Sequence, residues 1–147
     1  MLRRLVVTAT VSAAALACAM PAAGAVTSPL PLPVPLLDAP DRLMVVVSET
    51  GTRTDGRYRL KCAPAGGTHP SAKSACERLD ELARQNHDPF APVPAGQMCT
   101  QQFGGPATAR ITGTWQGRRV DATFNRSDGC EIRRWQILEP VLPNTRS

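Results

Sequence analysis

The chain has 147 residues, a formal net charge of +5, five cysteines and only 4% aromatic residues. This length is enough for one domain built around one hydrophobic core. The charge is mildly basic, no long run of like charges occurs, and few aromatic side chains lie between the basic ones. The composition therefore argues against nucleic acid or an anionic membrane as the main partner.

The first 25 residues have the pattern of a secretory signal peptide. Two arginines precede an apolar stretch, and small residues at positions 23–25 form a cleavage site. The apolar stretch is too short and too rich in alanine for a membrane-spanning helix, so we predict a secreted, extracellular protein without stable membrane insertion. The alternative is a lipoprotein, because the residues around Cys18 are loosely similar to a bacterial lipidation site.

Four cysteines remain after removal of the signal peptide: Cys62, Cys76, Cys99 and Cys130. In an exported protein this number implies two disulfides, and the sequence alone allows three pairings. Residues 26–41 are expected to form a flexible leader, because prolines at alternate positions exclude a helix or an interior strand.

The folded domain is expected to span residues 42–138. An apolar, β-branched run at 43–47 predicts a strand, and the alternating pattern at 57–62 predicts a second strand that forms a hairpin with it. Residues 64–71 read as a loop. Ser74 and Glu77 have the spacing of a capping box, so a helix with one apolar stripe is expected to follow and to end near residues 86–89.

A second β region follows a loop at residues 88–97, in which a short helical turn can form. The segments 111–115 and 118–124 flank Gln116 and Gly117, which suit a two-residue hairpin turn. A last strand with a bulge is predicted at 131–138, and residues 139–147 are expected to fray as a C-terminal tail. The fold class is therefore α+β: a five-stranded antiparallel sheet with one main helix, and at most one further short helix, on one side.

No catalytic constellation is present. The two histidines, His69 and His87, have no zinc-ligand spacing with the cysteines, and oxidised cysteines cannot bind metal. We therefore predict a protein that is not an enzyme and has no metal and no cofactor. Trp115 and Trp135 occupy strand positions and are expected to be core or interface residues rather than platforms for sugars.

Four segments carry a family resemblance. They are CAPAGGTHPSAKSAC (62–76), MCT (98–100), GTWQGRRV (113–120) and the final Cys130. In this order and spacing the chain resembles the subtilisin-inhibitor-like family of secreted bacterial serine protease inhibitors, over roughly residues 45–132. The resemblance implies the disulfides Cys62–Cys76 and Cys99–Cys130, a five-stranded sheet with helices on one side, and a homodimer formed through the sheets.

The resemblance also implies how the protein acts. The partners are serine proteases, most of all of the subtilisin type, and the reactive-site loop consists of Met98, Cys99, Thr100, Gln101, Gln102 and Phe103. Gln101 takes the primary specificity position, so the scissile bond is Gln101–Gln102. Asp128 stands where the family usually has an asparagine that supports the loop.

The chain departs from the family pattern next to this loop. Gln101 replaces the usual methionine, lysine or arginine, Gly104 and Gly105 form a looser stretch with one extra residue, and the C-terminus differs. A neutral, polar Gln101 suits neither trypsin nor chymotrypsin, whereas apolar Met98 favours subtilisin. The alternative function is a non-inhibitory binding module, secreted or anchored to lipid, that a protease cuts as an ordinary substrate.

Overall fold

The computed structural model describes residues 40–145. The predicted signal peptide, Cys18 and nearly all of the leader lie outside the described residues. A five-stranded antiparallel sheet has the strand order β3-β2-β1-β4-β5. Its strands are β1 (Arg42–Ser48), β2 (Gly56–Lys61), β3 (Gly66–Gly67), β4 (Thr108–Trp115) and β5 (Arg118–Phe124).

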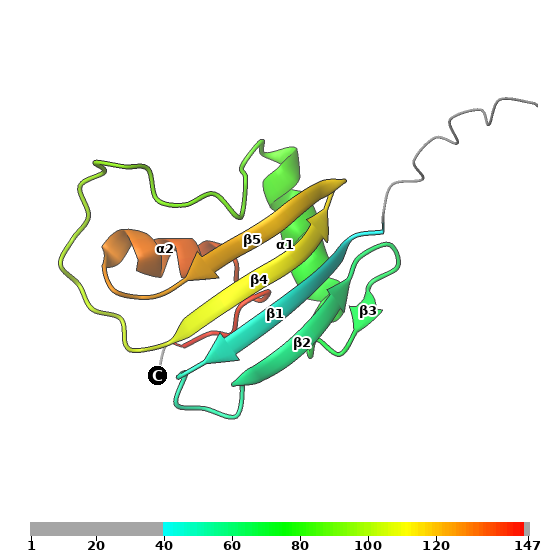
Figure 1. Ribbon diagram of the computed structural model, residues 1–147, viewed down its shortest axis with the longest axis horizontal. Coiled ribbons are helices and arrows are strands. Elements are labelled where there is room, and N and C mark those ends of the chain that lie inside the picture. Colours follow the sequence, from blue (N-terminus) through cyan, green and yellow to red (C-terminus); the bar gives the residue numbers. More distant parts are fainter. Residues whose placement is uncertain (1–39, 146–147) are drawn as a thin grey trace, which may run out of the picture. The chain divides into compact units, whose positions relative to one another are not determined.

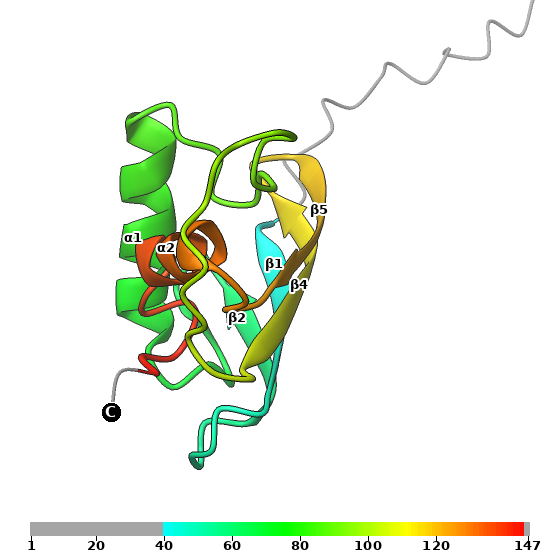
Figure 2. The same cartoon turned by 90° about the vertical axis from the view of Figure 1, so that its left-hand side faces the viewer.

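Two helices, α1 (Ala72–Arg84) and α2 (Gly129–Ile137), lie on the same side of this sheet. Figure 1 shows both helices behind the strands, and Figure 2 shows the two layers side by side. The predicted α+β class, with one main and one short helix on one side, is confirmed. No helix within residues 40–145 is long and apolar enough to cross a membrane.

Strand β1 lies at the centre of the sheet because it pairs with β2 on one side and with β4 on the other. Its alternation gives it two different faces: Leu43, Val45 and Val47 are buried under the helices, whereas Met44 and Val46 are half-buried on the open face. The hairpin of β1 and β2 is thus confirmed, and its inward face forms the middle of the core.

The second hairpin is also confirmed. Strands β4 and β5 pair from Ala109–Phe124 to Trp115–Arg118. Gln116 and Gly117 form the turn with φ angles of 47° and 71°. Two successive positive φ values are what a two-residue turn needs to match the twist of the strands.

One strand of the five is not the predicted one. The segment 64–71, expected to be only a loop, contains the short strand β3, which pairs with the end of β2. Gly67 has a φ of +104°, and a Cβ there would lie 2.0 Å from the carbonyl oxygen of Arg59. The strand therefore approaches its neighbour so closely that only glycine fits, and such a strand carries no alternation that a pattern could reveal.

The predicted last strand at 131–138 is wrong, because these residues belong to helix α2. The Asp128 side chain accepts hydrogen bonds from the backbone N–H groups of Cys130 (2.9 Å) and Glu131 (3.0 Å) and so caps the helix. Ile132 and Trp135, three positions apart, share the buried face of the helix. The odd spacing between Ile132 and Trp135, which suggested a β-bulge, is the spacing of one helical turn.

Helix α1 begins earlier than the capping-box pattern predicts. Its N-cap is Ser71, whose side chain makes no capping bond, and Ser74 lies inside the helix. The turn before it is held by His69, whose Nδ1 accepts a hydrogen bond from the Ser71 N–H (3.2 Å). The predicted apolar stripe is buried at Ala75, Cys76, Leu79 and Leu82.

The expectation of a frayed tail is wrong for residues 139–145. Val141 and Leu142 are fully buried in the core. The indole Nε1 of Trp135 donates to the Pro143 carbonyl (2.8 Å), and His69 Nε2 bonds the Val141 carbonyl (3.0 Å). Residues 139–143 are thus part of the folded layer under the sheet.

Candidate functional site

The reactive-site loop predicted at residues 98–103 lies on the long connection between α1 and β4. In Figure 1 this yellow-green connection arches past α2. Met98 is 97% exposed, Phe103 is 69% exposed, and Gln101 and Gln102 are exposed as well. The loop therefore presents large side chains to solvent, and none of them is a nucleophile, a base or a metal ligand.

The amino-terminal side of this loop is joined to α2 by two links. Cys99 forms a disulfide with Cys130, with the two Cα atoms 5.4 Å apart. The N–H of Gly129 donates a hydrogen bond to the carbonyl oxygen of Thr100 (3.0 Å). A Cβ at Gly129 would lie 2.0 Å from the Oγ1 of Thr100, so the loop packs directly on the first turn of the helix.

Asp128, predicted to support the loop, acts in this structure on the helix. Its carboxylate caps α2, and α2 carries both groups that hold the loop, the Gly129 N–H and the Cys130 sulfur. Any support that Asp128 gives to Thr100 therefore passes through the position of the helix start. Its effect on inhibition stays a prediction.

The carboxy-terminal side is held by Arg126, a residue that the sequence did not single out. The Nε of Arg126 donates to the carbonyl oxygen of Gly104 (2.7 Å), and the Gly104 N–H donates to the carbonyl oxygen of Arg126 (2.8 Å). A Cβ at Gly104 would meet Ile132 Cγ1 at 2.7 Å. Gly104 is thus tightly held, and of the two glycines expected to loosen the loop, only Gly105 borders open space.

These links matter because only part of the loop is packed against the body of the protein. A groove of about 540 Å³ lies beside it, and its lining includes Met98, Thr100 and Gln102 as well as Arg133 and Ile137 of α2. Core packing cannot fix the loop across such a space. The links at Cys99, Thr100 and Gly104 must fix it instead.

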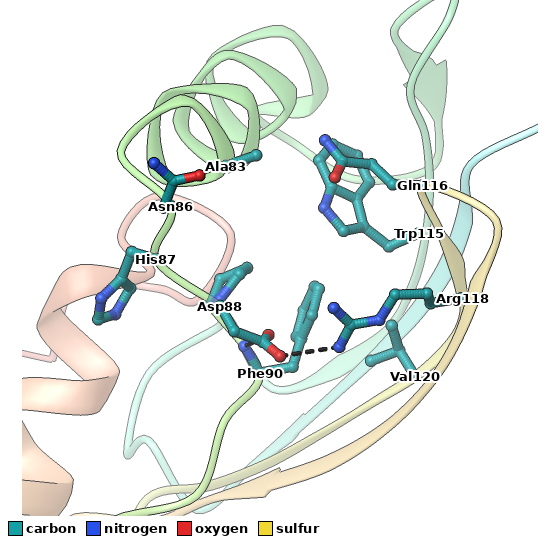
Figure 3. Close-up of a pocket in the computed structure, with 10 residues that line it drawn as sticks. Ala83, Asn86, His87, Asp88, Phe90, Trp115, Gln116, Arg118 and Val120 are labelled. Carbon is teal, nitrogen blue, oxygen red and sulfur yellow. Dashed lines mark hydrogen bonds and ion pairs between the residues drawn. The ribbon is translucent and has the colours of Figure 1, made fainter.

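The beginning of the long connection is fixed near the second hairpin. Asp88 accepts hydrogen bonds from the Phe90 N–H (2.9 Å) and from Arg118 (2.9 Å), the ion pair drawn in Figure 3. Figure 3 also shows Trp115 at the pocket of about 210 Å³ that these residues line. Trp115 is 5% exposed and Trp135 is fully buried, so both are core residues, as predicted.

Both disulfide pairings implied by the resemblance are confirmed. Cys62 is bonded to Cys76 within the core, and Cys99 to Cys130 at the loop. Within residues 40–145, one group of possible metal ligands comes together, and it consists of Cys99, Asp128 and Cys130. Its two sulfurs form a disulfide, so they provide no thiolate for a metal ion.

Comparisons with known proteins place this sequence in a family. The family profile described as "Subtilisin inhibitor-like" matches residues 39–127, more than half of the chain. "Subtilisin inhibitor-like protein 1" of Streptomyces cacaoi is 35% identical over 100 residues, which cover 61% of this chain and 86% of that protein. "Subtilisin inhibitor" of Streptomyces violaceus is 30% identical over 129 residues, covering 83% and 86%.

Among solved structures, sermetstatin of Streptomyces caespitosus in complex with the subtilisin of Bacillus licheniformis is 27% identical, with a TM-score of 0.46 and coverage of 71% of this chain and 99% of that one. The family profile covers all five strands, helix α1 and the segment with the exposed loop. The chain therefore belongs to the subtilisin inhibitor-like family.

Proposed function

We propose that this protein inhibits subtilisin-type serine proteases by presenting residues 98–103 as a rigid, substrate-like segment, with Gln101–Gln102 as the bond that enters the protease active site. Membership of a family of protease inhibitors, rather than enzymes, supports inhibition. The observation that carries the choice of segment is its geometry: exposed side chains at Gln101, Gln102 and Phe103 lie between links at Thr100 and Gly104.

Such a segment binds by the physics of an added β-strand. An extended backbone pairs with the edges of a protease cleft, while exposed side chains enter its pockets. The links to Arg126, Gly129 and Cys130 order the segment before it binds, so little conformational entropy is left to lose. A rigid complex of this kind reaches the high affinities that protease–inhibitor pairs show.

The links also explain why the protease does not turn the protein over. The active-site serine attacks the carbonyl carbon of Gln101, and the bond to the Gln102 nitrogen breaks. Gln102 cannot diffuse away, because Gly104, two residues further on, is bonded to Arg126. Its amine can attack the acyl carbon again, the ester bond to the serine breaks, and the proton returns to the serine oxygen through the protease histidine.

Secretion and the signal peptide at residues 1–25 are part of the same proposal. A target protease outside the cell and two disulfides both suit an oxidising, extracellular compartment. The mass of the mature protein in culture medium tests this: cleavage after Ala25 is expected, whereas a cell-bound protein with an acyl group on Cys18 would show the lipoprotein alternative.

A homodimer through the open sheet faces is proposed from the family resemblance. Met44 and Val46 provide a half-buried apolar centre on this face. The surrounding strand positions are strongly basic, and the one carboxylate among the outward strand residues, Asp121, pairs with Arg110 (2.8 Å). The outward cations are Arg42, Arg57, Arg59, Lys61, Arg110 and Arg119. Two such faces repel each other, so dimerisation should depend on salt.

Titration of subtilisin tests the inhibition. The mature protein should abolish activity at a molar ratio of one inhibitor chain per protease, with weaker inhibition of chymotrypsin and the weakest of trypsin. The control is Arg119→Lys. Arg119 lies on β5, away from residues 98–103, so this variant should inhibit subtilisin as strongly as the wild type. Steady cleavage at Gln101–Gln102 without loss of subtilisin activity would instead show an ordinary substrate, and the proposal would fail.

A further inference from the structure

Arg126 is a buried cation next to the reactive-site loop. Its residue is only 6% exposed, and in the described part of the chain His69 is the one other polar side chain buried to this degree. It lies in the short connection between β5 and α2, and its guanidinium carbon is 5.9 Å from the centre of the Trp135 ring. A charge in such a place needs strong compensation.

The compensation comes from the loop rather than from a carboxylate. Within residues 40–145 Arg126 takes part in no ion pair, its Nη1 has no hydrogen-bond partner, and its Nε bonds the Gly104 carbonyl at 2.7 Å. Arg134, the cation above Phe124, also has one nitrogen without a partner, its Nε, but it pairs with Glu131 at 2.8 Å and donates to the Thr123 carbonyl.

This difference has a consequence for stability. An apolar side chain of similar length would fill the site of Arg126 without the cost of burying an unpaired guanidinium. Replacing Arg126 should therefore leave global stability unchanged or raise it. Replacing Arg134 breaks an ion pair and a backbone contact and should lower it.

We infer that Arg126 is a positioning residue, which holds Gly104 so that the Gln102 amine stays at the acyl carbon after the protease has attacked Gln101. Its side chain donates to the Gly104 carbonyl, its own carbonyl accepts from the Gly104 N–H, and the Ile132 side chain packs beside Gly104. The inference rests on the proposed function, because it assigns the carboxy-terminal anchor of the same loop.

Loss of the Nε bond should weaken religation more than it weakens the fold. With Gly104 freer, the Gln102 amine spends less time in reach of the acyl carbon, and water competes for the ester. A small misplacement of reacting groups costs up to about 100-fold in rate, so Arg126→Met should be hydrolysed between about 10-fold and 100-fold faster than the wild type in its complex with subtilisin.

The experiment compares the wild type with Arg126→Met, Arg126→Lys and the matched control Arg134→Met. Each protein is incubated with subtilisin, and the cut at Gln101–Gln102 is followed on reducing gels, because the Cys99–Cys130 disulfide holds the two fragments together otherwise. The thermal midpoint of each free protein and the hydrogen exchange of the Gly104 amide are measured in parallel.

We expect Arg126→Met to keep or raise its thermal midpoint, to expose the Gly104 amide and to be cut faster, with Arg126→Lys between it and the wild type. Arg134→Met should melt earlier but be cut at the wild-type rate. The inference is overturned if the wild type inhibits and Arg126→Met is cut no faster, or if both Arg126 variants lose stability and inhibition in proportion. If the wild type itself does not inhibit, the proposed function fails. Independently of that result, unchanged hydrogen exchange of the Gly104 amide in Arg126→Met would show that Arg126 does not hold Gly104.

Discussion

The two disulfides lie in regions of opposite character. Cys62 and Cys76 are each 6% exposed and join the end of β2 to α1 inside the core. Cys99 and Cys130 lie at the surface and join an exposed loop to α2 beside a groove. The first bond adds to a region that packing already orders, whereas the second helps to order a loop that packs on the protein only near its ends and is exposed from Gln101 to Phe103. Stability and recognition should therefore be separable in this protein.

Removing each disulfide in turn is the strongest test of that contrast. Loop-closure entropy predicts a loss of about 3 kcal/mol of stability for each pair, somewhat more for the longer loop. Cys62→Ala with Cys76→Ala should nevertheless inhibit subtilisin normally below its melting temperature. Cys99→Ser with Cys130→Ser should lose inhibition and be cut as a substrate. Equal inhibition by the two folded variants, measured as inhibition constants, would remove the contrast.

A charge at the primary position should change specificity without touching the framework. Gln101→Lys supplies the partner for the aspartate of a trypsin-like pocket, so its trypsin inhibition constant should improve about 100-fold. The thermal midpoint should not move, because Gln101 is exposed.

Gln102→Lys is the matched control for the position of the scissile bond. It should gain nothing against trypsin. If it gains inhibition while Gln101→Lys does not, the extra residue in the loop has shifted the scissile bond by one position.

Alanine at each of two neighbouring glycines separates the anchored part of the loop from the free part. Gly104→Ala places a Cβ 2.7 Å from Ile132 Cγ1, so it should displace the loop and weaken subtilisin inhibition by about 10-fold. At Gly105 there is open space but a φ of +102°, so Gly105→Ala should cost about 1 kcal/mol of stability or more and change the inhibition constant less. The reverse order would mean that Gly104 is not an anchor.

Acid should weaken the framework before it affects the loop. Burial lowers the pKa of His69 below its ordinary value of 6.5, in spite of the Val141 hydrogen bond. The unfolded state therefore binds the proton more readily, so the stability present above pH 6.5 is lost as the pH falls below it. Melting curves between pH 8 and 5 should show this loss of stability in the wild type and in the control His87→Gln. The loss should be smaller in His69→Gln, because the titrating imidazole is gone.

The smallest expected effect concerns the proposed dimer. Because both open faces are basic, added salt should tighten the association by screening their repulsion. Sedimentation at low and high ionic strength measures it. Dissociation on adding salt would place attractive ion pairs in the interface and contradict the basic-face account.

The sequence predicts the regular part of this molecule well. Strand β1 shows as an apolar, β-branched run, β2 and β5 as alternation, and β4 as the partner of β5 across a two-residue turn, while helical spacing shows the buried stripe of α1. Helix α2 is missed because Ile132 and Trp135 fit a bulged strand as well as a helix. Asp128 and Glu131, three residues apart, are the capping signal that could have decided between the two.

The site divides in the same way. The exposed residues around Gln101 follow from the family resemblance, and so do the disulfides. Arg126 could not be foreseen, since it meets Gly104 across 22 positions of sequence and both residues lie in irregular connections. Contacts between two loops leave no periodic pattern in the sequence. Only the fold brings these residues together.

The most direct test measures the equilibrium between the intact chain and the chain cut at Gln101–Gln102, starting once from each form. Protein cut at Gln101–Gln102, with the Cys99–Cys130 disulfide intact, is incubated with a trace of subtilisin, and the intact chain is measured by mass spectrometry after reduction. We predict that the intact chain re-forms until the mixture matches the one reached from uncut protein. The contradicting result is a cut protein that stays cut while uncut protein is steadily converted to it. The links at Cys99, Thr100 and Gly104 would then not hold the two ends of the scissile bond together.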